Sequence, residues 1–422
     1  MNLPTTAGRR GFTAVELMVA VTAAMVVCAG AYTLARTSLE VFQQEARMNA
    51  AQFSNVMGMN RLTTDLKRAG YMMSPEAAND PNVCAKPTGD AATLLFAVNV
   101  QEGKNGTSTY SAASVADLPD LPVEVTGLGN NRQPDRVRVV GNYAIAESFK
   151  LANVDLDATS RLIAIEVDQL SVQRIFRDSL NGGRDFCSYF PAGSVSRLVD
   201  NAGKSRFIEV SACATVVNAT KSNYSSLKIT AVAIPTGPTC GELSGGYINP
   251  INIIDYAPIH LTPALAAGQG LGPTLQGVMD QDVAIAGIVG DGSRMELLRR
   301  ELDLAGNVIP GTAEIVADYV VDLNFSGRIA ADPTKPHQLT PVRFDEFIGD
   351  KPQNQVRQLG VRLSTRARNP DRDNAPNPPA EDQPLVRFRV FPVAATNRTQ
   401  WARVRTFFSE VNITNLNGIV PW

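Results

Sequence analysis

The sequence predicts an α+β protein in which one long N-terminal helix packs on antiparallel β-sheet. No proline occurs between Pro4 and Pro75, and apolar residues recur there at helical spacing. Beyond residue 92, short apolar runs are bounded by Gly, Asn, Asp or Pro, which is typical of strands. The chain also has 32 Gly and 26 Pro but only 19% charged residues, a composition that favours a loop-rich β protein over a helical bundle.

The chain opens with an apolar run that is long enough to cross a membrane. Residues 11–35 contain a single charge, Glu16. About 20 residues of helix, at about 1.5 Å each, cross the hydrocarbon of a bilayer. A carboxylate inside such a helix costs about 2.5–3.5 kcal/mol on insertion scales, and intramembrane carboxylates are usually functional. Glu16 is therefore a candidate functional residue.

Three interpretations of this N-terminus compete. In a secretory signal peptide, Arg9-Arg10 forms the basic region and Ala29-Gly30-Ala31 the cleavage site, but Glu16 opposes insertion. In a plain anchor, the basic pair stays in the cytoplasm and the carboxylate has no stated role. In the third interpretation, cleavage between Gly11 and Phe12 creates an α-amine one helical turn from Glu16. When such helices stack, the amine of one chain meets the carboxylate of its neighbour, and each charge has a partner in low dielectric.

The third interpretation agrees with a family resemblance. The segment RRGFTAVELMVAV, residues 9–21, resembles the class III leader of type IV pilins and type II secretion pseudopilins. The match consists of the basic pair Arg9 and Arg10, Gly11 before the cut, Phe12 after it and Glu16 at the fifth mature position. The resemblance implies a leader of residues 1–11, cleavage after Gly11 by prepilin peptidase, N-methylation of Phe12, assembly through Glu16 and a type IV pilin fold.

The helix is predicted to continue beyond the apolar run as an amphipathic segment. Apolar residues at mostly three- and four-residue steps predict one buried stripe: Leu39, Phe42, Ala46, Ala50, Phe53, Met57, Leu62, Leu66 and Ala69. Gly70 is the predicted helix end. A helix from Phe12 to this point would be roughly 85 Å long, with residues 12–35 in the membrane and residues 36–73 packed on a head.

The head, residues 74–422, is predicted to be β-rich and to lie outside the inner membrane. The helix end RLTTDLKRAGY and the apolar runs of residues 294–416 resemble minor pilins of the PilW type, and J-type pseudopilins of type II secretion are similar. In residues 358–366, Leu359, Val361 and Leu363 fall two apart with Arg362 on the other face, as a half-buried strand requires.

Residues 76–290 match no family pattern and are predicted to be a large β-rich insertion. Strand patterns occur at several places within it: residues 93–100, 136–140, 162–167, 206–217 and 227–234. Residues 101–135 and 240–280 are rich in Gly, Pro, Asn and Ser, so they are predicted to be long surface loops.

Four cysteines lie beyond the apolar run: Cys84, Cys187, Cys213 and Cys240. An exported head favours two disulfides. The segments 185–190 and 206–217 flank the turn DNAGK and predict a hairpin that brings Cys187 near Cys213, which leaves Cys84 to pair with Cys240. The competing pairing is Cys84 with Cys187 and Cys213 with Cys240, and the remaining alternative is free buried thiols. A fifth cysteine, Cys28, lies inside the apolar run.

The sequence shows no catalytic motif, and no catalytic residue or cofactor is predicted. There is no H-E-x-x-H, G-x-S-x-G or Walker pattern. A net charge of −2 argues against a nucleic-acid surface. Asp371, Asp373 and Asn374 are a weak calcium candidate, because they offer oxygen ligands in a loop but lack the glycine and terminal glutamate of an EF-hand.

These observations lead to the expectation of a non-enzymatic minor pilin of the PilW type. The resemblance implies assembly into a type IV pilus, in a priming or tip complex that supports motility or adhesion. The implied partners are prepilin peptidase, the inner membrane, other minor pilins, the major pilin and a tip adhesin. The protein would reside in the inner membrane before assembly and in the extracellular pilus afterwards. The alternatives are a J-type pseudopilin and a membrane-anchored periplasmic enzyme or binding protein.

Overall fold

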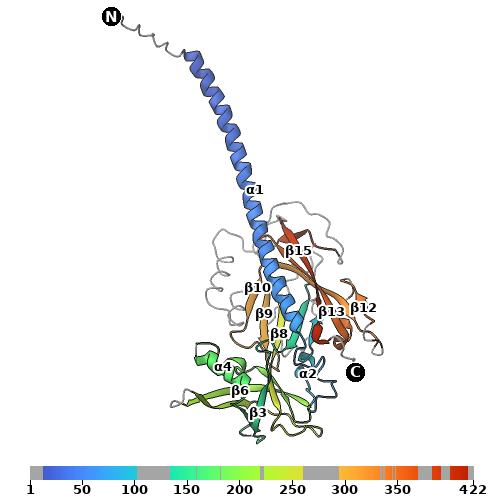
Figure 1. Ribbon diagram of the computed structural model, residues 1–422. Helices are drawn as coiled ribbons and strands as arrows, with labels where there is room; N and C mark the ends of the chain where they lie inside the picture. Colours follow the sequence, from blue (N-terminus) through green and yellow to red (C-terminus); the bar gives the residue numbers. More distant parts are fainter. Residues whose placement is uncertain are drawn as a thin grey trace, which may run out of the picture. The chain divides into compact units, whose positions relative to one another are not determined.

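The computed structural model has the predicted α+β composition, with one N-terminal apolar helix and antiparallel sheets. It describes residues 13–101, 134–157, 159–180, 182–218, 223–259, 294–332, 335, 338–344, 346, 348–368, 383–390 and 400–416. The chain divides into two units, Met1–Ala50 and Ala51–Trp422, and helix α1 (Ala14–Arg68) contributes to both (Figure 1).

The first unit contains an apolar stretch of α1 that is long enough to span a membrane. This stretch, Ala14–Leu39, has 26 residues, and none of it is buried inside the protein. Three hydroxyl groups within it donate to carbonyl oxygens of their own helix: Thr22 to Met18 at 3.0 Å, Thr33 to Gly30 at 2.8 Å and Thr37 to Thr33 at 2.9 Å. A helix surrounded by lipid must satisfy its polar groups internally in this way.

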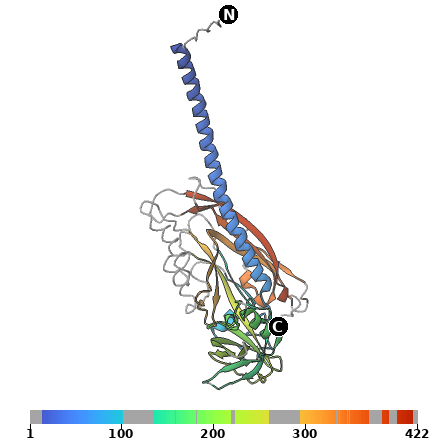
Figure 2. The same ribbon diagram turned by 60° about the vertical axis from the view of Figure 1, so that its left-hand side comes forward.

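In the second unit, the C-terminal part of α1 forms one side of the largest core. Met59, Leu62, Leu66 and Ala69 are buried against apolar residues of both sheets. The helix ends where predicted, because Gly70 has a φ of 76°, a left-handed conformation that favours glycine. Figures 1 and 2 both show strands β13 and β15 beside this part of α1.

The predicted stripe is wrong at five positions, because Ala46 is exposed and Leu39, Phe42, Phe53 and Met57 are 61%, 69%, 69% and 53% exposed. The packing on the head predicted for residues 36–73 therefore holds only for the part of α1 that begins at Ala51. The face that packs on the head instead carries Asn55 and Gly58. The Asn55 amide is buried and donates to the carbonyls of Leu363 and Arg405 at 3.0 and 2.8 Å. A Cβ on Gly58 would lie 2.8 Å from the Ala317 Cβ, so the helix approaches the head too closely for a larger side chain. Polar bonding and close approach thus outweigh apolar periodicity in orienting this segment.

A ten-stranded antiparallel sheet occupies the first part of the head. Its order is β1-β2-β8-β3-β4-β7-β6-β5, with β9 pairing to β8 and β10 to β9. The strands are β1 (Val98–Gln101), β2 (Arg136–Gly141), β3 (Phe149–Val154), β4 (Leu162–Ile165), β5 (Val195–Val199), β6 (Ser205–Asn218), β7 (Asn223–Ala231), β8 (Tyr247–Ile259), β9 (Glu296–Leu302) and β10 (Glu314–Ala317). Helices α2 (Asp90–Leu94) and α4 (Leu170–Leu180) and the 3-10 helix η1 (Phe186–Tyr189) accompany this sheet.

A five-stranded antiparallel sheet forms the second part of the head. Its order is β12-β11-β13-β15-β14. The strands are β11 (Val320–Ile329), β12 (Thr340–Val342), β13 (Val356–Arg366), β14 (Arg387–Val390) and β15 (Gln400–Asn412). Short 3-10 helices η2 (Ile348–Asp350), η3 (Gln353–Gln355) and η4 (Thr414–Leu416) complete it. As predicted, Leu359, Val361 and Leu363 face the core that contains Leu66. The strand is not half-buried as predicted, however, because Arg362 on its other face is buried as well, where it pairs with Asp322 at 2.7 Å.

Residues 76–290 are not a separate insertion, because their strands contribute to the core beneath α1. Val98, Val137 and Tyr256 are buried in the same cluster as Leu62. Residues 294–416 likewise do not form one sheet. Strand β9 pairs with β8, and β10 pairs with β9, so both strands belong to the ten-stranded sheet.

Strand β8, the central strand of the larger sheet, lies in the range 240–280 that was predicted to be a loop. It pairs with β3 and β5 in its first half and with β2 and β9 in its second. Pro250 and Pro258 lie within it, and proline normally argues against a central strand. Helix α4 was also missed, although the buried Val172, Ile175 and Phe176 have helical spacing.

Candidate functional site

The acidic residue of the apolar helix takes part in a helix cap. Thr13 immediately precedes α1. Its backbone N–H and its hydroxyl both donate to the Glu16 carboxylate at 3.0 Å, and the Glu16 N–H donates to the Thr13 hydroxyl at 3.3 Å. This reciprocal pattern is a capping box, which satisfies N–H groups that have no partner at a helix start. The residues Thr13 and Glu16, three positions apart before an apolar run, are the sequence signal for such a box.

Several predicted site residues lie outside the described part of the chain. They are the leader and cleavage residues Arg9, Arg10, Gly11 and Phe12, and the calcium candidates Asp371, Asp373 and Asn374. Within the described residues, no group of three or more His, Cys, Asp or Glu side chains is placed to hold a metal ion. Cleavage and calcium binding at these positions stay predictions.

The four cysteines of the head lie at disulfide distance in the pairs predicted first. The sulfur atoms of Cys84 and Cys240 are 2.09 Å apart, and those of Cys187 and Cys213 are 2.05 Å apart. The predicted reason for the second pair is wrong. Cys187 lies in η1, not in a strand, and the hairpin partner of β6 is β5, joined to it by the DNAGK turn. The chain packs η1 beside β6, so the two sulfur atoms meet without strand pairing.

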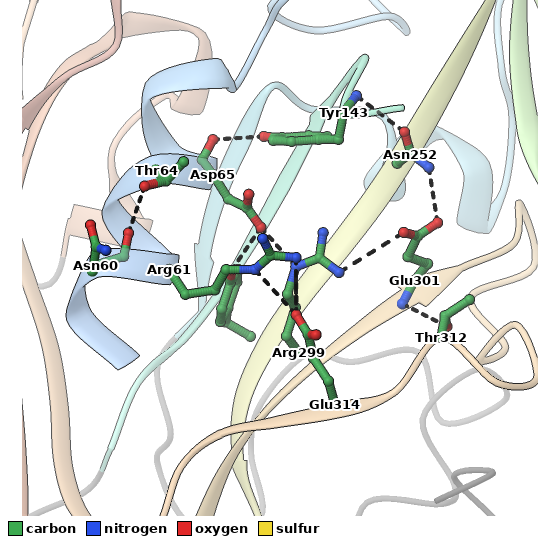
Figure 3. Close-up of polar contacts among 11 residues, drawn as sticks. Asn60, Arg61, Thr64, Asp65, Tyr143, Asn252, Arg299, Glu301, Thr312 and Glu314 are labelled. Atoms are coloured by element: carbon green, nitrogen blue, oxygen red, sulfur yellow. Dashed lines mark hydrogen bonds and ion pairs between the residues drawn. The ribbon is translucent and has the colours of Figure 1, made fainter. Parts of the chain in front are cut away.

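A buried polar cluster joins α1 to the ten-stranded sheet, and Figure 3 shows it in close-up. Asp65 of α1 is its centre. One oxygen of this carboxylate accepts from the Tyr256 hydroxyl of β8 at 2.7 Å and from Nε of Arg299 of β9 at 2.8 Å. The side chains of Asp65 and Arg299 are only 5% and 8% exposed. The Tyr143 hydroxyl donates to the Asp65 carbonyl at 2.9 Å, which adds a contact from the segment after β2.

The pKa values in this cluster favour a static ion pair over a proton-transfer site. Burial and the Asp65 charge together raise the pKa of Tyr256 well above its usual value. Burial alone would lower the pKa of Arg299, but the Asp65 charge outweighs it and raises that pKa. The phenol thus stays neutral and the guanidinium stays charged at any physiological pH. The arrangement holds the helix on the sheet, and it contains no nucleophile paired with a base.

The cluster extends outward to more exposed groups. Arg61 of α1 contacts Glu314 of β10 at 3.1 Å, and both side chains are 47% exposed. Glu314 also lies 3.5 Å from Nε of Arg299. A further buried row lies across β2, β8 and β9, where Asp255 accepts from Arg136 at 2.7 Å and from Arg300 at 2.9 Å. Burial would raise the pKa of Asp255, but these two arginines outweigh it and hold that pKa well below its usual range.

Known proteins offer no guide to this site. Comparisons with family models, with curated proteins and with solved structures found no match to the chain. What can be concluded about function therefore comes from the residues themselves.

One buried carboxylate predicts a pH dependence of folding stability. Glu296 of β9 has a fully buried side chain that contacts Arg294. Burial raises its pKa to about 7, against the opposing charge of Arg294. Between about pH 4.5 and 7 the folded chain therefore binds more protons than the unfolded chain, and stability falls as pH rises through this window. Below it, Glu296 is neutral in both states.

Replacing Glu296 with glutamine is expected to remove this pH dependence. At pH 8 the free energy of unfolding should rise by about 1–3 kcal/mol, because a neutral amide replaces a buried charge. Denaturant unfolding of the detergent-solubilised chain at pH 5 and 8 measures it. The control is Glu45→Gln, at an exposed position of α1. An unchanged pH slope in Glu296→Gln would contradict the assignment.

Proposed function

We propose that the chain is a structural subunit of a type IV pilus, a minor pilin of the PilW type, and not an enzyme. The observation that carries the proposal is Glu16, a carboxylate one turn inside a membrane-length apolar helix, directly after the Gly11-Phe12 leader pattern. A charge in that position is costly unless it has a partner. After cleavage, the positive α-amine of Phe12 in a neighbouring subunit supplies one.

Two features of the described chain support a role in helix assembly. Phe53, Val56 and Met57 of α1 are 69%, 45% and 53% exposed, so the helix keeps apolar side chains available beyond its membrane-length stretch. The Asp65 cluster and Asn55 anchor the helix to the head on its other face. Anchoring one face while leaving an apolar face free is what a subunit that assembles through its helix requires.

The Thr13 cap provides a competing explanation of Glu16, and a pair of variants separates the two. If the carboxylate serves only as a helix cap, Thr13→Ala and Glu16→Ala should impair pilus assembly equally. If it partners a neighbouring amine, Glu16→Ala should reduce surface pili at least about tenfold while Thr13→Ala leaves most of them. Pili sheared from cells and quantified by immunoblot measure this. Glu45→Ala, which removes an exposed carboxylate of the same helix, is the matched control.

The start of the mature chain tests processing independently. N-terminal sequencing should find N-methylated Phe12, whereas a start at Tyr32 means ordinary secretion and an intact Met1 means an uncleaved anchor. Either of these two results contradicts the proposal. Deletion of the gene distinguishes a pilus subunit from the nearest alternative, a J-type pseudopilin. Loss of surface filaments supports the pilus subunit. Loss of secreted enzymes with intact filaments supports the pseudopilin.

A further inference from the structure

The five-stranded sheet has a cavity on the face that does not contact α1. Its volume is about 320 Å³, at the small end of the range of about 300–1,000 Å³ that is usual for ligand pockets. Gln358 and Gly360 of β13 line it, and they alternate with Leu359 and Val361, which face the core under α1. The cavity therefore opens away from the helix and from the Asp65 cluster.

Glycine at position 360 keeps the floor of this cavity open. A Cβ built there would lie 2.3 Å from the Ser326 hydroxyl oxygen and 3.9 Å from the Phe344 ring. The wall beside it is apolar and aromatic, formed by Pro341, Val342 and Phe344. The Phe344 ring is fixed in place, since it packs edge-to-face on Phe408 and covers the buried Arg362 guanidinium at 5.0 Å. The site is thus a preformed hollow with a rigid aromatic side.

The polar groups around the hollow carry an excess of positive charge. Arg328 and Arg343 line it, both are exposed, and neither guanidinium has an ion pair or hydrogen bond within the described residues. Guanidinium groups bind carboxylates through paired, charge-assisted hydrogen bonds. The one acidic lining residue, Glu410, accepts from the Gln358 amide at 2.8 Å.

Glu410 decides which anions fit. A carboxylate in the hollow repels a ligand that is anionic throughout, such as a phosphate, but accepts hydrogen bonds from hydroxyl groups. The remaining acceptor capacity of Glu410 and Gln358, with the Ser326 hydroxyl, suits a ligand rich in hydroxyls that also bears one carboxylate. The apolar wall at Phe344 suits the C–H face of a compact ring.

We propose that this cavity binds an acidic sugar unit, a uronic acid. Its carboxylate lies between Arg328 and Arg343, and its hydroxyl groups donate to Glu410 and Gln358. The volume admits one sugar residue, so a longer acidic polysaccharide would be bound through one unit at a time. This inference does not depend on the proposed pilus function, because it concerns a site on the head alone.

Isothermal titration calorimetry of the full chain in detergent tests the proposal, with glucuronate and galacturonate as probes. We expect saturable binding of at least one uronate, about tenfold or more tighter than binding of glucose, because glucose lacks the carboxylate. Inorganic phosphate should bind more weakly than that uronate. No detectable uronate binding, or equal affinity for glucose, would overturn the proposal.

Variants locate the binding in the cavity. Arg328→Gln with Arg343→Gln removes both charges from exposed positions, so folding should be intact, and the uronate affinity should fall at least about tenfold. Gly360→Ala fills the floor and should also abolish binding. Arg405→Gln, on the same sheet at an exposed position of β15 that faces the other way, is the matched control and should bind as the unmodified chain does. Unchanged affinity in the double variant would place the ligand elsewhere and overturn the proposal.

Discussion

Replacing Asp65 with alanine is expected to lower the free energy of unfolding of the head by about 3–5 kcal/mol. The substitution removes the acceptor for the Tyr256 hydroxyl and for Arg299 Nε, at 2.7 and 2.8 Å. It leaves the phenol and a guanidinium that is only 8% exposed without that acceptor. Glu314 and Glu301 stay 3.5 and 3.9 Å from the Arg299 guanidinium, too far for a good hydrogen bond. The cost therefore arises from the buried donors left without a close acceptor more than from the net worth of the ion pair.

Two comparisons identify the cause of that loss. Arg61→Ala breaks the neighbouring pair with Glu314, in which both side chains are 47% exposed, and should cost less than about 1 kcal/mol. Combining Asp65→Leu with Arg299→Met should recover much of the stability, because no buried charge then lacks its partner. Denaturant unfolding followed by circular dichroism measures all three proteins. If the double variant is as unstable as Asp65→Ala, the ion pair itself contributes the stability, and the argument from the stranded charge is wrong.

This cluster also shows where sequence patterns stop being informative. The end of α1 at Gly70 and the alternation of Leu359, Val361 and Leu363 follow from local conformational preference and burial, and both were predicted. Asp65 and Arg299 are far apart in the sequence, and each resembles an ordinary surface charge. Only the pairing of β8 with β9 and the packing of α1 on them bring the two side chains together.

The errors at Phe53 and within β8 have a related origin. Apolar periodicity assigned Phe53 to the core, but hydrogen bonds from Asn55 to two strand carbonyls set the orientation of the helix. The Gly, Pro, Asn and Ser content of residues 240–280 suggested a loop, yet partners on both sides stabilise β8 within that range. In both places a tertiary interaction outweighs the local preference. The functional prediction depends less on tertiary interactions. Glu16 was identified from the free-energy cost of placing a carboxylate inside an apolar, membrane-length helix.

Removal of the disulfide between Cys84 and Cys240 is expected to have the second large effect on the free energy of unfolding. These residues are 156 positions apart, and the chain-entropy model assigns about 5 kcal/mol to closing a loop of that length. The Cys187–Cys213 bond closes only 26 positions, for which the same model assigns about 3.5 kcal/mol. The longer loop contains β1 to β7, so the bond restricts most of the ten-stranded sheet in the unfolded chain.

Replacing both cysteines of each pair with alanine tests this ordering. Cys84→Ala with Cys240→Ala should lower the free energy of unfolding by more than Cys187→Ala with Cys213→Ala, by about 1–2 kcal/mol. The native position of residue 84 should persist, because its N–H donates to the Ser205 carbonyl at 3.0 Å and Val83 bridges Ser205. Unfolding in guanidinium with and without reductant measures both bonds. The reverse order would mean that native contacts around η1 and β6, and not restriction of the unfolded chain, determine what these bonds contribute.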